Sequence, residues 1–154
     1  MENIVEKEYK EAVKGLTLET LNNSSAWYDY ALNLPITQQI VYTIVLFHSQ
    51  VENGGFHQYF FNSYGQFAYL TLKNLKTIGG IKRAKLLDDA LRHVNGENLP
   101  ENIFRKLVVN RKLSRIVDFK NELFDYLNNL DNKYYDIEGE DIYELLEKYL
   151  KESR

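Results

Sequence analysis

The chain has 154 residues and a formal net charge of −3, a size that fits one domain with a single core. It contains no cysteine, which excludes disulfides, thiolate metal sites and cysteine nucleophiles and suits a reducing compartment. The charged N-terminus lacks the apolar run of a secretory signal, and no apolar stretch approaches the about 20 residues that span a bilayer. We therefore expect a cytoplasmic protein with no membrane partner.

Charge is distributed unevenly along the sequence. Residues 73–115 contain 11 basic and 4 acidic residues, a net charge of +7, whereas residues 116–152 contain 11 acidic and 4 basic residues, a net charge of −7. Such segregation has two interpretations. It produces one basic and one acidic face that steer charged partners, or the two segments neutralise each other in the fold.

Apolar residues recur at helical spacing along nearly the whole chain. In chain order the spacing predicts helices over residues 4–16, 18–31, 37–52, 56–62, 66–78, 81–94 and 101–128, the last being one bent helix or two, and a final helix after residues 138–140. No alternating run is long enough to predict a strand, and there is no internal repeat. We predict a single all-α domain, residues 1–154, built as a bundle of about seven to eight helices.

The helix predicted over residues 37–52 is apolar around most of its circumference, which is typical of a helix surrounded by others. Asn53-Gly54-Gly55 follows it, and glycine readily enters the left-handed backbone region that closes helix C-termini. Phe56 and Tyr59 then resume helical spacing with an aromatic face. We predict a buried central helix that ends at a fixed Asn-Gly-Gly corner.

Polar side chains flank this corner, namely Glu52, Asn53, Gln58, Tyr59 and Asn62. In one interpretation they bind backbone amides and hold the corner. In the other they line a pocket for a small ligand or for a side chain of a partner, where Glu52 would act as a general base only with a raised pKa.

Two histidines near the corner raise the question of a metal. His48 and Glu52 are four residues apart on one helical face, and His57 follows the glycines. The spacing is generic, and a histidine on a largely apolar helix is more often a hydrogen-bonded core residue. The sequence also lacks a phosphate loop, a nucleophile elbow and a dinucleotide fingerprint. We expect no metal, no cofactor and no catalytic activity.

Several motifs resemble the core of the DNA-mimic-protein-like bacterial domain family. They are Glu52-Asn53-Gly54-Gly55-Phe56, Gln58-Tyr59-Phe60, Asn62-Ser63, Ile78-Gly79, the stretch 86–90 and, towards the C-terminus, Leu130-Asp131 with Tyr134-Tyr135 and Asp141. The similarity covers roughly residues 37–151 and leaves residues 1–36 as additional N-terminal helices. It implies an all-α domain, often dimeric, in a family largely without assigned function. It also implies a mode of action in which surface carboxylates stand in for DNA phosphates on a regulator.

The resemblance and the acidic segment together predict a non-catalytic protein-interaction domain whose partner is a DNA-binding regulator. The predicted acidic interaction surface comprises Asp131, Asp136, Glu138, Glu140, Asp141, Glu144 and Glu147. An alternative is direct nucleic-acid binding through the basic middle, with Lys82, Arg83, Lys85, Arg105, Lys106, Arg111, Lys112 and Arg115 as phosphate ligands. A third is the ligand or enzyme pocket at the Glu52-Asn53-Gly54-Gly55 corner. Both charged sets are also consistent with solvated helix faces.

Overall fold

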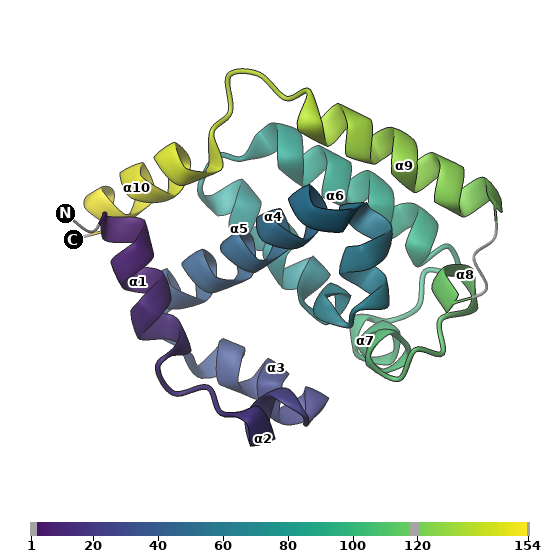
Figure 1. Cartoon of the computed structure of the whole chain (residues 1–154), viewed down its shortest axis with the longest axis horizontal. Coiled ribbons are helices and arrows are strands. Elements are labelled where there is room, and N and C mark those ends of the chain that lie inside the picture. The colour runs from purple at the N-terminus through teal and green to yellow at the C-terminus, as the bar shows by residue number, and fades with distance from the viewer. Residues whose placement is uncertain (1–2, 118–120, 154) are drawn as a thin grey trace.

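A computed structural model describes residues 3–117 and 121–153, and this part of the chain is built from helices without strands (Figure 1). The helices are α1 (Ile4–Val13), α2 (Leu18–Leu21), α3 (Ser24–Asn33), α4 (Ile36–Phe61), the 3₁₀-helix η1 (Tyr64–Phe67), α5 (Ala68–Thr77), α6 (Ile81–Val94), α7 (Glu101–Val109), α8 (Ser114–Val117), α9 (Asn121–Tyr135) and α10 (Ile142–Glu152). Eight of them have seven residues or more, so the predicted all-α fold is confirmed.

Helix α4 is the central element of the fold. It packs against α1, α5, η1 and α9, with further contacts to α3, α8 and α10. Ile40, Ile44, Phe47 and Val51 on this helix are fully or almost fully buried. A helix enclosed by so many others has to be apolar around most of its surface, as the sequence predicted.

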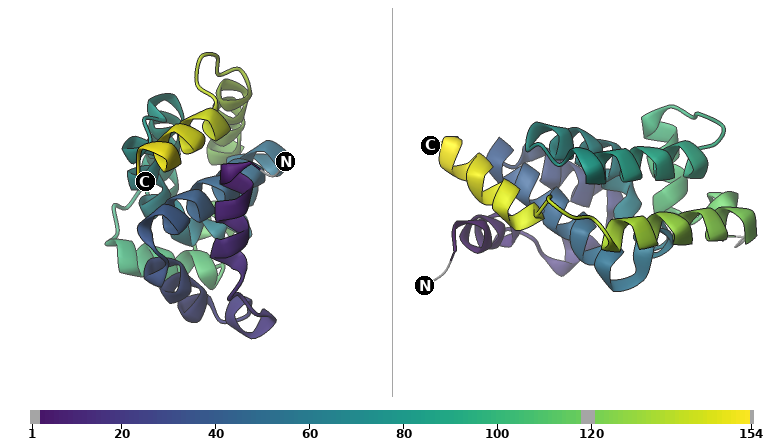
Figure 2. Two further views of the ribbon diagram at one scale, coloured as in Figure 1. Left: turned by 90° about the vertical axis from the view of Figure 1, so that its left-hand side faces the viewer. Right: turned by 90° about the horizontal axis from the view of Figure 1, so that it is seen from above.

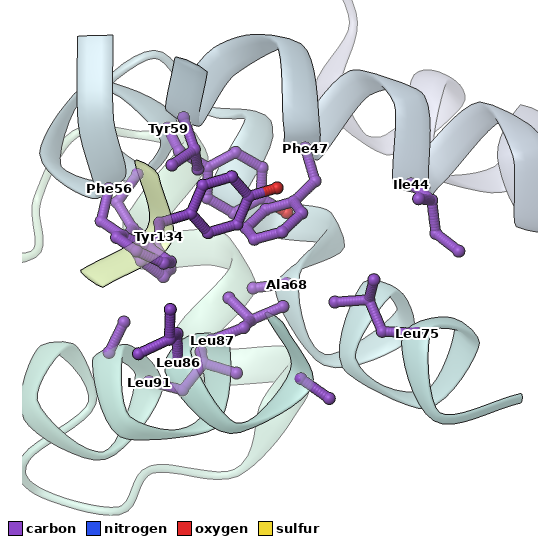
Figure 3. Close-up of a cluster of buried hydrophobic side chains, with 14 of the residues drawn as sticks. Ile44, Phe47, Phe56, Tyr59, Ala68, Leu75, Leu86, Leu87, Leu91 and Tyr134 are labelled. Carbon is purple, nitrogen blue, oxygen red and sulfur yellow. The ribbon is translucent and has the colours of Figure 1, made fainter. Parts of the chain in front are cut away.

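The main core is aromatic where α4 meets α9. The Phe47 ring meets Tyr59 edge to face at 5.1 Å and Tyr134 at 5.8 Å, and Tyr134 in turn contacts Phe56 at 5.9 Å (Figure 3). All four side chains are buried, and leucines of α6 close the cluster from below in this view. Edge-to-face packing of this kind adds to the free energy gained by burying the rings.

Two predicted helices are divided. Residues 18–31 form α2 and α3, because Asn23 caps α3 by accepting the Ala26 N–H at 3.1 Å. The sequence predicted one bent helix or two over residues 101–128, but the described part of this range contains parts of three. These are α7, α8 and the start of α9, and Arg111 takes a positive φ of 53° between α7 and α8.

Helices α9 and α10 follow one another along one long side of the molecule, and α10 packs against α1 (Figure 2). The loop between them carries several of the predicted acidic residues. Within the described ranges, no helix combines the length and apolar character needed to cross a bilayer.

Candidate functional site

The break in α4 lies at Gly55 alone. Its φ of 82° and ψ of 179° are non-helical, whereas Asn53 and Gly54 continue the helix. This conformation is extended with a positive φ, a region used almost only by glycine, and it is not the left-handed cap that the sequence predicted. Helix α4 therefore consists of two helical segments that meet at a kink at Gly55, within the predicted corner, and the first segment extends two residues beyond residue 52.

Two side chains of α9 form hydrogen bonds with the α4 backbone at this kink. In a continuous helix the Phe56 N–H would donate to the carbonyl of Glu52. Here it donates to Oδ1 of Asp131 at 2.8 Å. One turn further along α9, the Tyr135 hydroxyl donates to the Val51 carbonyl at 3.0 Å. The two side chains thus contact the backbone on both sides of Gly55.

The sequence placed Asp131 in a solvent-facing acidic surface, and this prediction is wrong. The side chain is half-buried, and burial raises its pKa, while the hydrogen bond from Phe56 acts in the opposite direction. Its oxygen would lie 2.2 Å from a Cβ added to Gly55. Asp131 is therefore a structural partner of the glycine.

The polar set at the corner does not gather into the predicted pocket. Tyr59 is buried in the core, and burial raises its pKa. The Gln58 side-chain amide donates to Gln50 at 3.2 Å, and Asn62 is exposed after the end of α4. Glu52 is 46% exposed and lies 4.0 Å from His48. These side chains therefore have separate surroundings and do not face one pocket.

The two predicted histidines also separate. Oxygen of the Tyr134 side chain lies 2.6 Å from Nδ1 of His48, whereas Nε2 of His57 lies 3.1 Å from the Ile116 carbonyl oxygen. Burial lowers the pKa of His48 and raises that of Tyr134, so an uncharged ring faces a protonated hydroxyl near neutral pH. Within residues 3–117 and 121–153, no three His, Asp or Glu side chains come together as a metal site.

Glu140 is the second predicted acid that does not face solvent. It accepts the N–H groups of Lys82 at 2.7 Å and Arg83 at 3.0 Å, which places a carboxylate at the N-terminus of α6. It also forms an ion pair with Arg83 at 3.1 Å, and the two side chains are 7% and 8% exposed. Neither this pairing nor the stacking of Arg83 over Tyr134 at 5.0 Å could be read from the sequence.

The other predicted acids divide into two groups. Asp141 caps α10 by accepting the Glu144 N–H at 3.0 Å, and Glu147 pairs with Lys151 at 2.9 Å. The remaining three are exposed, and no ion pair formed between described residues involves them: Asp136, Glu138 and Glu144.

The basic middle does not present a continuous face of free cations. Arg83 is buried with Glu140, and the Arg105 guanidinium stacks over the Tyr28 ring at 3.8 Å. Arg115 donates to the His93 carbonyl at 2.8 Å. On the outer face of α6, Lys85 pairs with Asp89 at 3.2 Å, and Arg92 with Asp88 at 3.1 Å. The arrangement gives no support to direct nucleic-acid binding.

A hollow of about 530 Å³ lies between α4, the α9–α10 loop and the start of α10. Its lining includes His48, Glu52, Asp141, Tyr143 and Glu144. Tyr143 meets the His48 ring edge to face at 5.8 Å and was not singled out by the sequence. The polar groups near the corner therefore meet the acidic segment here, and not around Gln58 and Asn62.

The fold and this site define an all-helical domain in which α9 fixes a kinked central helix and leaves carboxylates exposed along one side. The sequence matches the DMP19-like protein family over residues 32–153, and the chain belongs to this family of DNA mimic proteins. The predicted resemblance is thereby confirmed, while α1, α2 and most of α3 precede the matched region. The comparisons with curated proteins and with solved structures gave no match.

Proposed function

We propose that the protein is a non-catalytic interaction domain that binds a protein partner, one that itself binds nucleic acid, through the carboxylates of α9, α10 and the loop between them. Family membership supports this proposal. The observation that carries it is the exposure of Asp136, Glu138 and Glu144, none of which takes part in an ion pair among the described residues. Carboxylates that form no internal ion pair attract an external basic surface, and in the described part of the chain the one cation bonded to this set is Lys82, whose ammonium group donates to the main-chain carbonyl of Glu138 at 2.6 Å and not to its carboxylate.

The density of charge limits the form of mimicry. Glu122, Asp125 and Asp136 are the exposed acids on and just after α9, and the first and last are separated by roughly 21 Å of helix. Duplex DNA carries about 12 phosphate charges over that length. The surface therefore suits local capture of a basic patch better than replacement of an extended duplex.

Competition with DNA tests the proposal. Proteins that bind immobilised heparin would be passed over the immobilised full chain and eluted with duplex DNA or with increasing salt. We expect elution by both, since DNA and the carboxylates would occupy the same basic surface and ions screen it. The variant Asp136→Asn/Glu138→Gln/Glu144→Gln should retain less. Retention unaffected by DNA, by salt and by this variant would contradict the proposal.

A further inference from the structure

Two hollows adjoin at Tyr143. The polar one described above is followed by another of about 400 Å³ between α1, α4 and α10, whose lining includes Val5, Tyr9 and Val45. Tyr143 lines both. We call the combined feature the α4 trough, because Val45, His48 and Glu52 lie along one face of α4 at spacings of three and four residues. These three positions span roughly 10 Å.

The two ends of the α4 trough differ chemically. The end between α1 and α4 is lined by valine and tyrosine side chains together with Asn3, Glu6 and Lys10, whose two charges offset each other, whereas the other end carries the carboxylates of Glu52, Asp141 and Glu144. Arg83 also lines this end, but its charge is neutralised by the buried pair with Glu140. The polar end therefore has a net negative charge with no counterion of its own among the described residues that line it.

Tyr143 lines both hollows of the trough, and its contact with His48 restrains its side chain. Tyr143 is 48% exposed and lies on the first turn of α10. Its ring contacts the His48 ring. His48 is itself fixed by the hydrogen bond to the buried Tyr134. A half-exposed tyrosine on a rigid support next to carboxylates suits a cation, which can lie over its ring, and such residues often dominate binding energy.

We propose that the α4 trough is the docking site for a segment of a partner protein that carries an apolar side chain close to an arginine or lysine. The apolar side chain lies against Val5, Tyr9 and Val45, and the cation lies between Tyr143, Glu52 and Glu144. In a polyproline II segment, which has three residues per turn and rises about 3.1 Å per residue, a separation of roughly 9 Å corresponds to three residues and places both side chains on one face. This inference rests on the proposed function in one respect, namely that the partner is basic.

Charge complementarity decides the occupant. A second copy of this chain would have to insert a segment with both features, and an acidic segment is repelled by Glu52, Asp141 and Glu144. A small neutral ligand would leave these carboxylates unused. A basic segment uses both ends of the trough, and the long-range attraction also speeds its association.

Titration of the ¹⁵N-labelled full chain with short peptides tests the proposal. The probe is acetyl-Leu-Ala-Ala-Arg-amide, and the matched peptides replace Arg by Glu or Leu by Gly. We expect the Leu/Arg peptide to shift the amide signals of Val45, His48, Tyr143 and Glu144, with weaker effects from the Gly peptide and none from the Glu peptide. Equal shifts with the Arg and Glu peptides, or none at the trough, would overturn the assignment.

Variants separate the trough from the rest of the acidic side. Tyr143→Ala should weaken binding of the Leu/Arg peptide about fivefold or more, Glu144→Gln less, and Tyr143→Phe little because the ring remains. Two matched controls away from the trough, Glu122→Gln on α9 and Leu18→Ala on α2, where Leu18 is 79% exposed, should leave the affinity unchanged. Unaltered affinity in Tyr143→Ala, or dimerisation through the trough without peptide binding, would refute the inference.

The two proposals can fail separately. If Tyr143→Ala still retains nucleic-acid-binding proteins in a DNA-competable manner, the proposed function stands and the trough assignment is wrong. If the Leu/Arg peptide binds the trough but no nucleic-acid-binding protein is retained, the trough assignment stands and the proposed function is wrong.

Discussion

The chain contains two glycine pairs with the same sequence and different structural roles. At Gly79-Gly80, Gly79 has a φ of 83°, its N–H donates to Lys76 at 3.2 Å, and the Gly80 N–H donates to Leu75 at 2.8 Å. These two bonds form the Schellman cap that ends α5. At Gly54-Gly55, the second glycine kinks α4 and its conformation is supported by Asp131, 76 residues later. The first pair is fixed by local backbone bonding, and the second by tertiary structure.

This difference is visible in the space around each glycine. A Cβ on Gly79 would meet nothing within 4 Å, whereas a Cβ on Gly55 would lie 2.2 Å from Asp131 Oδ2. Both positions require a positive φ, but at Gly55 the site also lacks room for a side chain. Substitutions can therefore distinguish a local cap from a clamped kink.

Gly55→Ala should have the largest effect. The backbone strain alone costs about 1–3 kcal/mol, and displacement of the Asp131 carboxylate removes the cap on Phe56, so we expect a loss of about 3 kcal/mol in the free energy of unfolding. Urea denaturation followed by circular dichroism measures it. Gly54→Ala is the matched control: Gly54 is helical, and its added Cβ meets the movable end of Gln58, so that variant should be near neutral. Similar losses in both variants would show that the clamp is not specific to Gly55.

Asp131→Ala should rank second. It removes the acceptor of the Phe56 N–H in a half-buried place, which costs about 1–2 kcal/mol, whereas Asp131→Asn keeps an acceptor oxygen and should cost less. The same denaturation experiment applies. In the double variant Gly55→Ala/Asp131→Ala the losses should be less than additive, because each substitution removes the same contact. Full additivity would mean that the two residues act independently.

Gly79→Ala should have a smaller effect than either. Only the positive φ is unfavourable there, because no neighbouring atom obstructs the new methyl group, and we expect a loss of about 1 kcal/mol. The melting temperature and the urea midpoint both report it. A loss as large as that of Gly55→Ala would remove the distinction between the two pairs.

The comparison also explains which features the sequence could predict. The all-α class, the apolar α4, the limits of α6 and the cap at Gly79-Gly80 depend on periodicity and on local backbone bonding, and local sequence contains both. The position of the corner near Gly54-Gly55 was predictable for the same reason. That Gly55 alone breaks the helix was not, because the choice depends on Asp131 from α9.

The same limit applies to the acidic surface. Asp131, Glu140 and Glu144 are equivalent in a count of charges, yet the first caps the second half of α4, the second is buried against Arg83, and the third is exposed. Sequence spacing places residues on a helix face but does not show which backbone N–H or guanidinium lies opposite. The sequence shows that Asp131 and Tyr135 lie one turn apart on the same helix. It does not show that they hydrogen-bond to the backbone of α4 on both sides of Gly55.

The smallest effect concerns the pH dependence of the clamp. Because burial raises the Asp131 pKa, the folded protein binds this proton more tightly than the unfolded chain does. The parent protein therefore loses part of its stability as the pH rises from the unfolded value, about 4, through the raised folded value. An asparagine side chain does not titrate, so the stability of Asp131→Asn relative to the parent should improve between about pH 4 and pH 7, as measured by urea denaturation at several pH values. A relative decline over this range would mean that the Phe56 N–H favours the carboxylate more strongly than burial penalises it.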